Sequence, residues 1–488
     1  MMAPALWALG GPSRHPGERG VGGMSTGDVL GPACLLASVS MLSTLATYVY
    51  HWFRFSRTEA LHAIEILELE AAPPLTHVVV VCAYSEPLEV LERTFESIAA
   101  QRGLQNNPIA VLASEARDHT RHNSFAHLQS ITKGRLSICM TEHELEEGEP
   151  AGKASNENFA VRAVHRKLID DLGLDPFEVI ITIADADSVF SETYLAQVGT
   201  AYCNEPDGRR LIYKGPLNVY RNFSDAGLLV QSLELARCHA DAFHGLFSVP
   251  YPYSNYSLAL GFASEIGFWT PDAMPEDIHT ANKAIVNSFG SRTTVLVNAV
   301  ICNDLVPTIG ERYAQAKRHQ WGSLTELAWV VALWTETGLR FPAWWAVFAS
   351  ESQRSGSLPS AVMALACYVQ VSICVYFVGV QGQVLPAHVR PLLWAAGVSV
   401  LWSWIWFWVA ELAYWNTVMR QFPAQRPSAC RWALLVLASP LAYVVNNVLF
   451  FILPTLHALC HAAFAGHELV YRTAPKGDAA RRPLCGIA

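Results

Sequence analysis

The chain is poor in charged residues and has no basic excess. Of its 488 residues, 16% are Asp, Glu, Lys or Arg, and 51% are hydrophobic. Globular domains in water contain about 25% charged residues, so part of this chain is not expected to face water. The formal net charge of -8 argues against a nucleic acid as a partner, because surfaces that bind one are rich in Lys and Arg.

The cysteines do not follow a recognisable pattern either. None of the eleven belongs to a C-x-x-C pair. A disulfide framework or a zinc site needs such regular spacings, so the sequence predicts reduced thiols in the core or in lipid.

The N-terminal region combines a Gly- and Pro-rich segment with a long hydrophobic run. Residues 1–28 are predicted to be disordered, because their composition cannot bury enough apolar surface. The segment 29–53 is predicted to form a transmembrane helix, since residues 29–50 carry no charge and are long enough to cross the hydrocarbon. A signal peptide is the rival interpretation, but Arg54 and Arg57 follow the run directly.

The C-terminal third is again hydrophobic. A segment at 326–350 is predicted to lie in the membrane interface as an amphipathic helix, because Glu326, Glu336 and Arg340 would be costly at the bilayer centre. Three further transmembrane helices and a C-terminal tail are expected, at 358–383, 391–413, 431–459 and 460–488.

The distribution of arginines predicts the orientation. Arginines follow the first span and lie between the last two, which places the catalytic domain in the cytosol by the positive-inside rule. The chain is expected to be a multi-pass integral membrane protein. If the source is eukaryotic, the expected membrane is that of the Golgi or the plasma membrane. The side on which the tail lies stays open.

Residues 74–325 have the composition of an α/β domain. Strands are predicted at 76–84, 107–115 and 178–187, with helices at 87–101 and 153–169 between them. This alternation predicts a Rossmann-like, mostly parallel sheet. Ligands bind beyond the carboxyl ends of the strands in such sheets, so the residues that follow the strands are the candidates for a site.

Asp185 and Asp187 end one predicted strand. Two carboxylates so close repel each other unless a cation lies between them. A Mg²⁺ or Mn²⁺ ion that also binds substrate phosphates would satisfy both, and a solvated acidic turn is the alternative.

Three other motifs accompany this pair. Lys153 opens a helix after Gly152, which suits an anion or a sugar. Glu276 and Asp277 begin another helix after a proline, where they would alternatively compensate the helix dipole. Residues 311–323 gather further polar and aromatic side chains, which would alternatively form a basic helix at the membrane surface: Gln315, Arg318 and Trp321.

The order of these motifs resembles that of the membrane-bound family 2 glycosyltransferases with a GT-A domain, the group that contains cellulose, chitin and hyaluronan synthases. The resemblance covers residues 74–325 and the predicted spans. It implies an α/β GT-A fold, a nucleotide-sugar donor such as a UDP-sugar, and Mg²⁺ or Mn²⁺ as cofactor. It also implies a glycan or lipid-linked acceptor and a lipid bilayer as partners.

The resemblance assigns roles to individual residues. Asp277 would be the general base, and Asp185 and Asp187 would bind the metal and the donor diphosphate. Trp321 and Glu276 would contact the acceptor. The donor would be bound by Ala83, Tyr84, Glu86, Glu115, Lys153, Gln315 and Arg318. Two positions depart from the family pattern: Glu115 stands where Asp is usual, and Trp321 comes three residues after Arg318 instead of next to it.

The chemistry of sugar transfer is consistent with these roles. The leaving diphosphate needs positive charge and the attacking hydroxyl needs a base, so one base on the opposite face of the sugar gives inversion. The predicted function is an inverting glycosyltransferase that elongates a glycan, with or without processivity. A transferase that moves one sugar to a lipid carrier, and an inactive membrane scaffold, are the alternatives.

Overall fold

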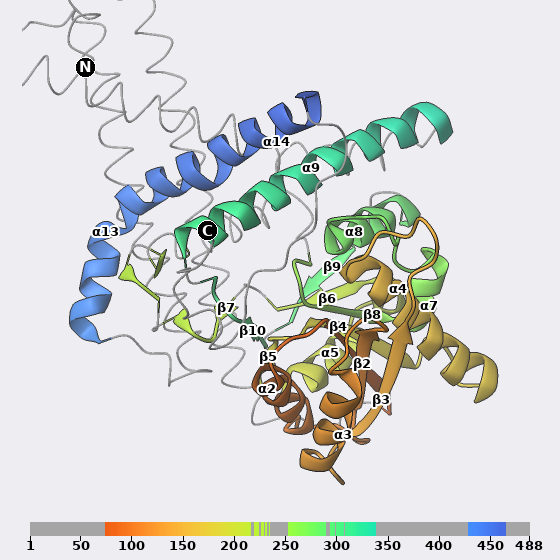
Figure 1. Ribbon diagram of the computed structural model, residues 1–488. Helices are drawn as coiled ribbons and strands as arrows, with labels where there is room; N and C mark the ends of the chain where they lie inside the picture. The colour runs from red at the N-terminus through yellow and green to blue at the C-terminus, as the bar shows by residue number, and fades with distance from the viewer. Residues whose placement is uncertain are drawn as a thin grey trace, which may run out of the picture.

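The computed structural model shows a sheet domain and three helical segments that follow it in sequence (Figure 1). The residues described are 74–215, 219–223, 226–228, 230, 231, 234, 252–288, 293–297, 299–306, 308–337 and 428–464. The predicted disordered N-terminus and the predicted spans at 29–53, 358–383 and 391–413 lie outside these residues.

A seven-stranded mixed sheet forms the centre, in the order β3-β2-β1-β4-β8-β6-β9. Strands β3, β2, β1 and β4 are parallel, whereas β8 runs antiparallel to both β4 and β6. The prediction of a mostly parallel α/β sheet is therefore confirmed. The strands are β1 (Thr76–Ala83), β2 (Ile109–Glu115), β3 (Ser137–His143), β4 (Val179–Asp185), β6 (Ile212–Lys214), β8 (Tyr256–Ala259) and β9 (Thr294–Leu296).

A smaller sheet of three strands lies beside the larger one. Its order is β5-β10-β7, with β5 antiparallel and β7 parallel to β10. Because β5 follows β4 almost directly, this sheet is built onto the loop that carries Asp187. Its strands are β5 (Val189–Phe190), β7 (Val219–Tyr220) and β10 (Ile301–Asn303).

Helices connect and cover the strands. They are α2 (Leu88–Ala99), α3 (Arg121–Ile131), α4 (Lys153–His165) with its π-helical extension η2 (Arg166–Asp171), α5 (Tyr194–Asn204), the short η3 (Gly208–Arg210), α7 (Leu260–Glu265) and α8 (Glu276–Asn287). The predicted helices at 87–101 and 153–169 correspond to α2 and to α4 with η2. Strand β3 was not predicted, because its residues alternate between exposed and half-buried and give no long apolar run.

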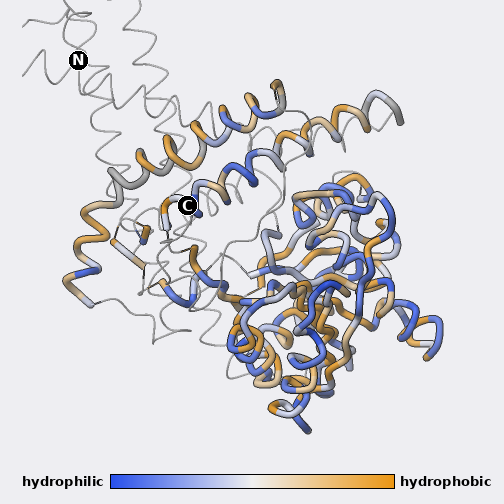
Figure 2. Tube along the Cα trace, viewed as in Figure 1, coloured by the Kyte–Doolittle hydropathy of each residue, from blue (hydrophilic) through white to orange (hydrophobic). Residues whose placement is uncertain are grey.

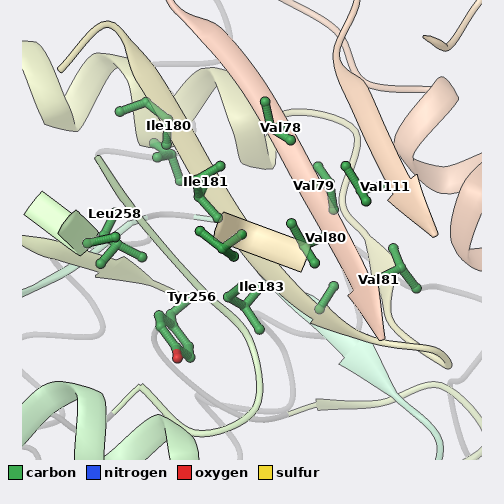
Figure 3. Close-up of a cluster of buried hydrophobic side chains, with 14 of the residues drawn as sticks. Val78, Val79, Val80, Val81, Val111, Ile180, Ile181, Ile183, Tyr256 and Leu258 are labelled. Carbon is green, nitrogen blue, oxygen red and sulfur yellow. The ribbon is translucent and has the colours of Figure 1, made fainter. Parts of the chain in front are cut away.

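The core explains why the central strands are continuous hydrophobic runs. Residues Val78 to Val81 of β1 have no exposed surface, because helices cover both faces of the sheet. In the register of the sheet, Val80 lies between Val111 of β2 and Ile183 of β4 (Figure 3). Each such side chain contributes about 1.5–3 kcal/mol by burial. This rigid centre fixes the positions of the strand ends.

Three more helical segments follow the sheet in sequence. They are α9 (Ile309–Thr337), α13 (Ala429–Asn447) and α14 (Leu453–Phe464), the last two joined by the π-helical η6 (Val448–Ile452). Figure 1 shows α14 alongside α9, with α8 between α9 and the sheet. Thr455 of α14 donates a hydrogen bond to Gln320 of α9, 3.0 Å away.

Within the part of the chain that is described, no helix has both the length and the hydrophobicity to cross a bilayer. The predicted span at 431–459 falls on α13, η6 and α14, and its Arg431 donates to Gln231 and to the carbonyl oxygen of Ala226. Figure 2 shows hydrophobic residues along α13 and a more polar first half of α9. The membrane part of the predicted architecture therefore has no support from these residues.

The predicted border between the GT-A domain and the interfacial segment, at residues 325 and 326, lies inside α9. The helix continues through it without interruption. Glu326 is buried and accepts hydrogen bonds from His279 and Asn282 of α8. This part of α9 thus packs against the helix that carries Asp277.

Candidate active site

Lys153 lies at the centre of an acidic cluster. Its ammonium nitrogen is 2.8 Å from Oδ1 of Asp185, 2.9 Å from Oε1 of Glu276 and 3.4 Å from Oε1 of Glu157. These residues come from the end of β4 and the first turns of α8 and α4. The amide of Asn156 holds α4 in place, because it donates a 2.8 Å hydrogen bond to the buried carbonyl oxygen of Ala113 in β2. One cation therefore joins three separate elements of the fold.

The electrostatics of this cluster keep the lysine charged. Burial lowers the pKa of Lys153, but the surrounding carboxylates outweigh burial and hold its pKa well above the ordinary value. Burial also raises the pKa of Glu157 and of Glu276, although Lys153 opposes this shift in both. The cluster has fewer positive than negative groups, so it favours additional cations.

The loop after β4 holds its two carboxylates in different surroundings. The chain turns at residues 186 and 187, so the two side chains are not on one extended segment as the sequence argument assumed. Asp185 faces Lys153, whereas Oδ2 of Asp187 accepts a 3.0 Å hydrogen bond from the backbone N–H of Asp304. The hydroxyl of Thr94 in α2 also anchors this loop, donating to the carbonyl oxygen of Ala186 at 2.7 Å.

Two asparagines hold the same loop in place: Asn255, just before β8, and Asn303, at the end of β10. Oδ1 of Asn255 accepts hydrogen bonds from the backbone N–H of Asp185 (3.2 Å) and the hydroxyl of Ser188 (2.9 Å). The amide of Asn255 donates to Asn303 at 2.8 Å, and Asn303 donates to Oδ2 of Asp185 at 3.4 Å. The positions of both aspartates are therefore set by a polar network.

Asp304 is a third carboxylate at this loop, which no sequence motif indicated. Its side chain is only 6% exposed, and it pairs with Arg221 at 2.6 Å and with Arg93 at 3.8 Å. Burial and the neighbouring Asp187 raise its pKa, and the two arginines oppose that shift. The pairing of Asp304 with arginines makes this side of the loop less negative than the side at Lys153.

The residues present fit a divalent ion in one particular way. Among the described residues, no three His, Cys, Asp or Glu side chains are grouped to hold a metal ion. Asp185 already binds a cationic group, and Asp187 is two residues away. One or two carboxylates completed by phosphate oxygens and water is the usual environment of Mg²⁺ in nucleotide sites. Asp185 and Asp187 fit that arrangement.

Asp277 lies next to the lysine cluster. Its Oδ2 accepts a 2.9 Å hydrogen bond from the backbone N–H of Ser254, and its Oδ1 accepts one from Ile278 at 2.7 Å. Ser254, which has a positive φ of 62°, also accepts a 3.4 Å hydrogen bond from Lys153 through its carbonyl oxygen. The fold therefore brings the first turn of α8 to the loop of Asp185, as the sequence argument required.

The loops after β1 and β2 form a second part of the site. Ala83 is the buried last residue of β1, whereas 41% of Tyr84 is exposed. Tyr84 stacks with the guanidinium of Arg117, whose central carbon is 4.3 Å from the ring centroid, and Arg117 pairs with the buried Glu115. Glu86 accepts a hydrogen bond from the backbone N–H of Tyr84. A flat, cation-supported aromatic face of this kind suits a nucleobase.

Asp118 connects these two loops and was missed in the sequence. It accepts hydrogen bonds from the backbone N–H and the hydroxyl of Ser85 (3.2 and 3.4 Å) and from Thr120 (2.9 and 2.8 Å). Burial raises the pKa of Asp118, but these hydrogen bonds outweigh it and hold the pKa below its ordinary value. Its sequence signal is its position three residues after Glu115, in the loop that follows β2.

Gln315, Arg318 and Trp321 lie on α9. Gln315 accepts a 3.0 Å hydrogen bond from Arg312, which pairs with the buried Glu234. Trp321 is 5% exposed and makes an edge-to-face contact with His461 of α14, 5.6 Å between centroids. These contacts of Gln315 and Trp321 are with other parts of the helical region and not with the lysine cluster.

Comparisons with known proteins give only distant likenesses. No family model matches the chain, and no curated protein matches it. Solved structures that resemble it include the mannosyltransferase PcManGT from Pyrobaculum calidifontis in complex with GDP-Man and Mn²⁺, with 16% identity and a TM-score of 0.41 over 89% of this chain and 99% of that one.

Two other similar structures are longer than the matched region. S. aureus TarS has 12% identity and a TM-score of 0.33 over 69% of this chain. GalNAc-T7 with UDP, GalNAc and Mn²⁺ has 12% identity and a TM-score of 0.30 over 51% of this chain. The chain spans about half of each, 55% and 51% respectively. TM-scores below 0.5 establish no shared fold, so a functional assignment has to come from the site itself.

Proposed function

We propose that the protein is a metal-dependent, inverting glycosyltransferase of the membrane-bound family 2 type, with a UDP-sugar as donor and a glycan as acceptor. The observation that carries the proposal is the bridge made by Lys153 between Asp185 and Glu276. It places the acidic loop at the carboxyl end of β4 beside the helix turn that holds Asp277. A donor diphosphate and an acceptor hydroxyl need such neighbouring but separate groups.

The roles of the residues follow from their contacts. Tyr84 and Arg117 offer a flat face to the nucleobase. Asp185 and Asp187 would hold Mg²⁺ or Mn²⁺, which when bound neutralises negative charge on the leaving diphosphate. Asp277 accepts the proton of the attacking hydroxyl, and its two backbone hydrogen bonds fix the direction of its carboxylate.

Attack by the hydroxyl oxygen on the anomeric carbon breaks the bond between that carbon and the diphosphate oxygen. The electron pair leaves with the nucleoside diphosphate, and the proton of the hydroxyl moves to Asp277. A single displacement of this kind inverts the anomeric configuration. It requires no covalent nucleophile from the protein.

Association with a membrane, with the catalytic domain in the cytosol, belongs to the same proposal. Exposed apolar side chains on the helical segments support it: Leu437 is 70% and Phe464 88% exposed. Contact with lipid would remove these apolar side chains from water, whereas in a soluble monomer they stay exposed.

The test is a panel of nucleotide sugars with the purified full-length protein, read out as released UDP or GDP. Asp277→Asn is expected to lower kcat by at least about a hundredfold, because it removes the proton acceptor, while donor affinity measured by calorimetry stays within about twofold. Asp272→Asn, at an exposed position in the loop before α8, is the matched control and should retain activity. Full activity of Asp277→Asn would contradict the proposed base.

The product distinguishes the modes of transfer. Saccharides of graded length indicate elongation of a glycan, whereas one lipid-linked sugar indicates transfer to a carrier. No release of nucleotide from any donor in the panel would refute the proposed activity.

A further inference from the structure

The cation in the acidic cluster is part of the protein itself. Lys153 is 14% exposed and within ion-pair distance of Asp185, Glu276 and Glu157. Asp185 is one of the two residues proposed to hold a divalent ion. An ammonium on one oxygen of Asp185 and a divalent ion on the same carboxylate repel each other strongly when both are shielded from water.

Glu157 provides a second position for the ammonium. It has no exposed surface, and neither of its carboxylate oxygens has a hydrogen-bond partner among the described residues. Lys153 lies one turn earlier on the same helix, with its ammonium 3.4 Å from Oε1 of Glu157. A buried carboxylate with so weak a pairing is costly in this state, so an ammonium that moves toward it gains a favourable partner.

We propose that Lys153 is a resident cation that occupies Asp185 when no donor is present and moves toward Glu157 when a divalent ion binds Asp185. This inference rests on the proposed function, because it uses the metal position assigned there. After the exchange, Asp185 is free to bind the divalent ion, and the ammonium still pairs with a carboxylate of the cluster. It needs only a rotation of the lysine side chain, since α4 is anchored to β2 through Asn156. Lys153 therefore competes with the metal and is more than a contact to the donor.

Removal of Lys153 is expected to change the affinity for Mn²⁺ in an unusual direction. Removal of a donor-binding lysine would normally weaken ligand binding. Removal of a competing cation instead makes Mn²⁺ bind more tightly in the absence of donor. A variant that keeps the positive charge but binds carboxylates through two nitrogens should make Mn²⁺ bind more weakly.

The experiment is a titration of the purified full-length protein with Mn²⁺ alone, with free Mn²⁺ measured by electron paramagnetic resonance. Lys153→Met is expected to lower the Kd for Mn²⁺ by about tenfold, the equivalent of ~1.4 kcal/mol. Lys153→Arg is expected to raise that Kd by about threefold or more. The Arg variant carries the inference if Lys153→Met does not fold.

Arg93→Met is the matched control. Arg93 also pairs with a carboxylate of this loop, Asp304, but at 3.8 Å and without contact to Asp185. Its removal tests the general effect of losing one positive charge and should change the Kd by less than about threefold. An equal or larger effect of Arg93→Met, or weaker Mn²⁺ binding by Lys153→Met, would overturn the inference.

The outcomes separate this inference from the proposed function. If Asp185→Asn abolishes Mn²⁺ binding while Lys153→Met and Lys153→Arg leave it unchanged, the metal position stands and the competition is refuted. If Lys153→Met binds Mn²⁺ more tightly but the wild-type protein turns over no donor, the competition stands and the glycosyltransferase proposal is refuted. If neither wild type nor Lys153→Met binds Mn²⁺, both are refuted.

Discussion

The contact between α9 and α8 offers a prediction whose size can be worked out. Glu326 is buried, and its two oxygens accept hydrogen bonds from Nδ1 of His279 at 2.9 Å and from Asn282 at 3.0 Å. Glu326→Ala removes both acceptors and leaves two buried donors unsatisfied. Each such donor costs about 1–3 kcal/mol, so a loss of about 2–6 kcal/mol is expected in total.

A second variant separates the hydrogen bonds from the charge. Glu326→Gln keeps the shape and one acceptor oxygen, but its amide nitrogen meets one of the two donors. The His279 ring can adapt by exchanging the protonated nitrogen, so the expected loss is smaller, about 1–3 kcal/mol. Thr325→Ala changes the exposed neighbouring side chain and should stay within about 0.5 kcal/mol.

The effect should be localised at α8, which begins with Glu276 and Asp277. Hydrogen exchange of the backbone amides of α8 is the assay, together with the thermal midpoint and kcat. We expect faster exchange in α8, a lower midpoint and a reduced kcat for Glu326→Ala, because the proposed base is no longer held in one position. Unchanged protection of α8 would refute the reasoning that α9 positions this helix.

Three further predictions concern other parts of the site and the core. Tyr84→Ala should raise the KM for the donor about tenfold with kcat nearly unchanged, since it removes the stacking face for the base; a change in kcat alone would contradict this. Asp118→Asn should raise the donor KM in the same assay. Because the folded-state pKa of Asp118 is lowered, the stability that this carboxylate contributes is present above its unfolded pKa and is lost as pH falls through its folded pKa. The unfolding midpoint of the variant should therefore depend less on acid pH. Burial lowers the pKa of His77 from 6.5 to about 4, so between these pH values the unfolded chain binds a proton that the folded chain does not. The free energy of unfolding should fall by roughly 3 kcal/mol as pH falls through this window. His77→Leu should reduce this pH dependence, measured by denaturant unfolding at several pH values.

The central fold was predictable because its signals are local. The run of valines in β1 and the isoleucines of β4 give the continuous hydrophobic pattern of a strand buried on both faces. The helices that follow begin where the sequence indicates, α2 after Pro87 and α8 after Pro275. The antiparallel insertion of β8 between β4 and β6 was not predictable, because it depends on pairing between segments far apart in the chain.

The candidate site was predictable only as a set of positions. Asp185, Lys153, Glu276 and Asp277 were chosen from their motifs, and the fold brings them together. Their contacts were not predictable, since side-chain distances depend on the packing of α4 and α8 against the sheet. Asp118 and Asp304 were missed because each acts through a partner distant in sequence, Ser85 for the first and Arg221 for the second.

Glu157 shows how a helical spacing can carry information that a motif does not. In the sequence it is one polar residue in a helix that opens with Gly152 and Lys153. Four residues is one helical turn, so the structure places its carboxylate beneath the ammonium of Lys153 and without exposed surface. A buried glutamate on the core side of a helix would destabilise an ordinary helix contact by more than an i,i+4 pair can return. Its position behind the proposed metal-binding aspartate is therefore best explained by a second state of the site, in which the lysine has moved away from Asp185.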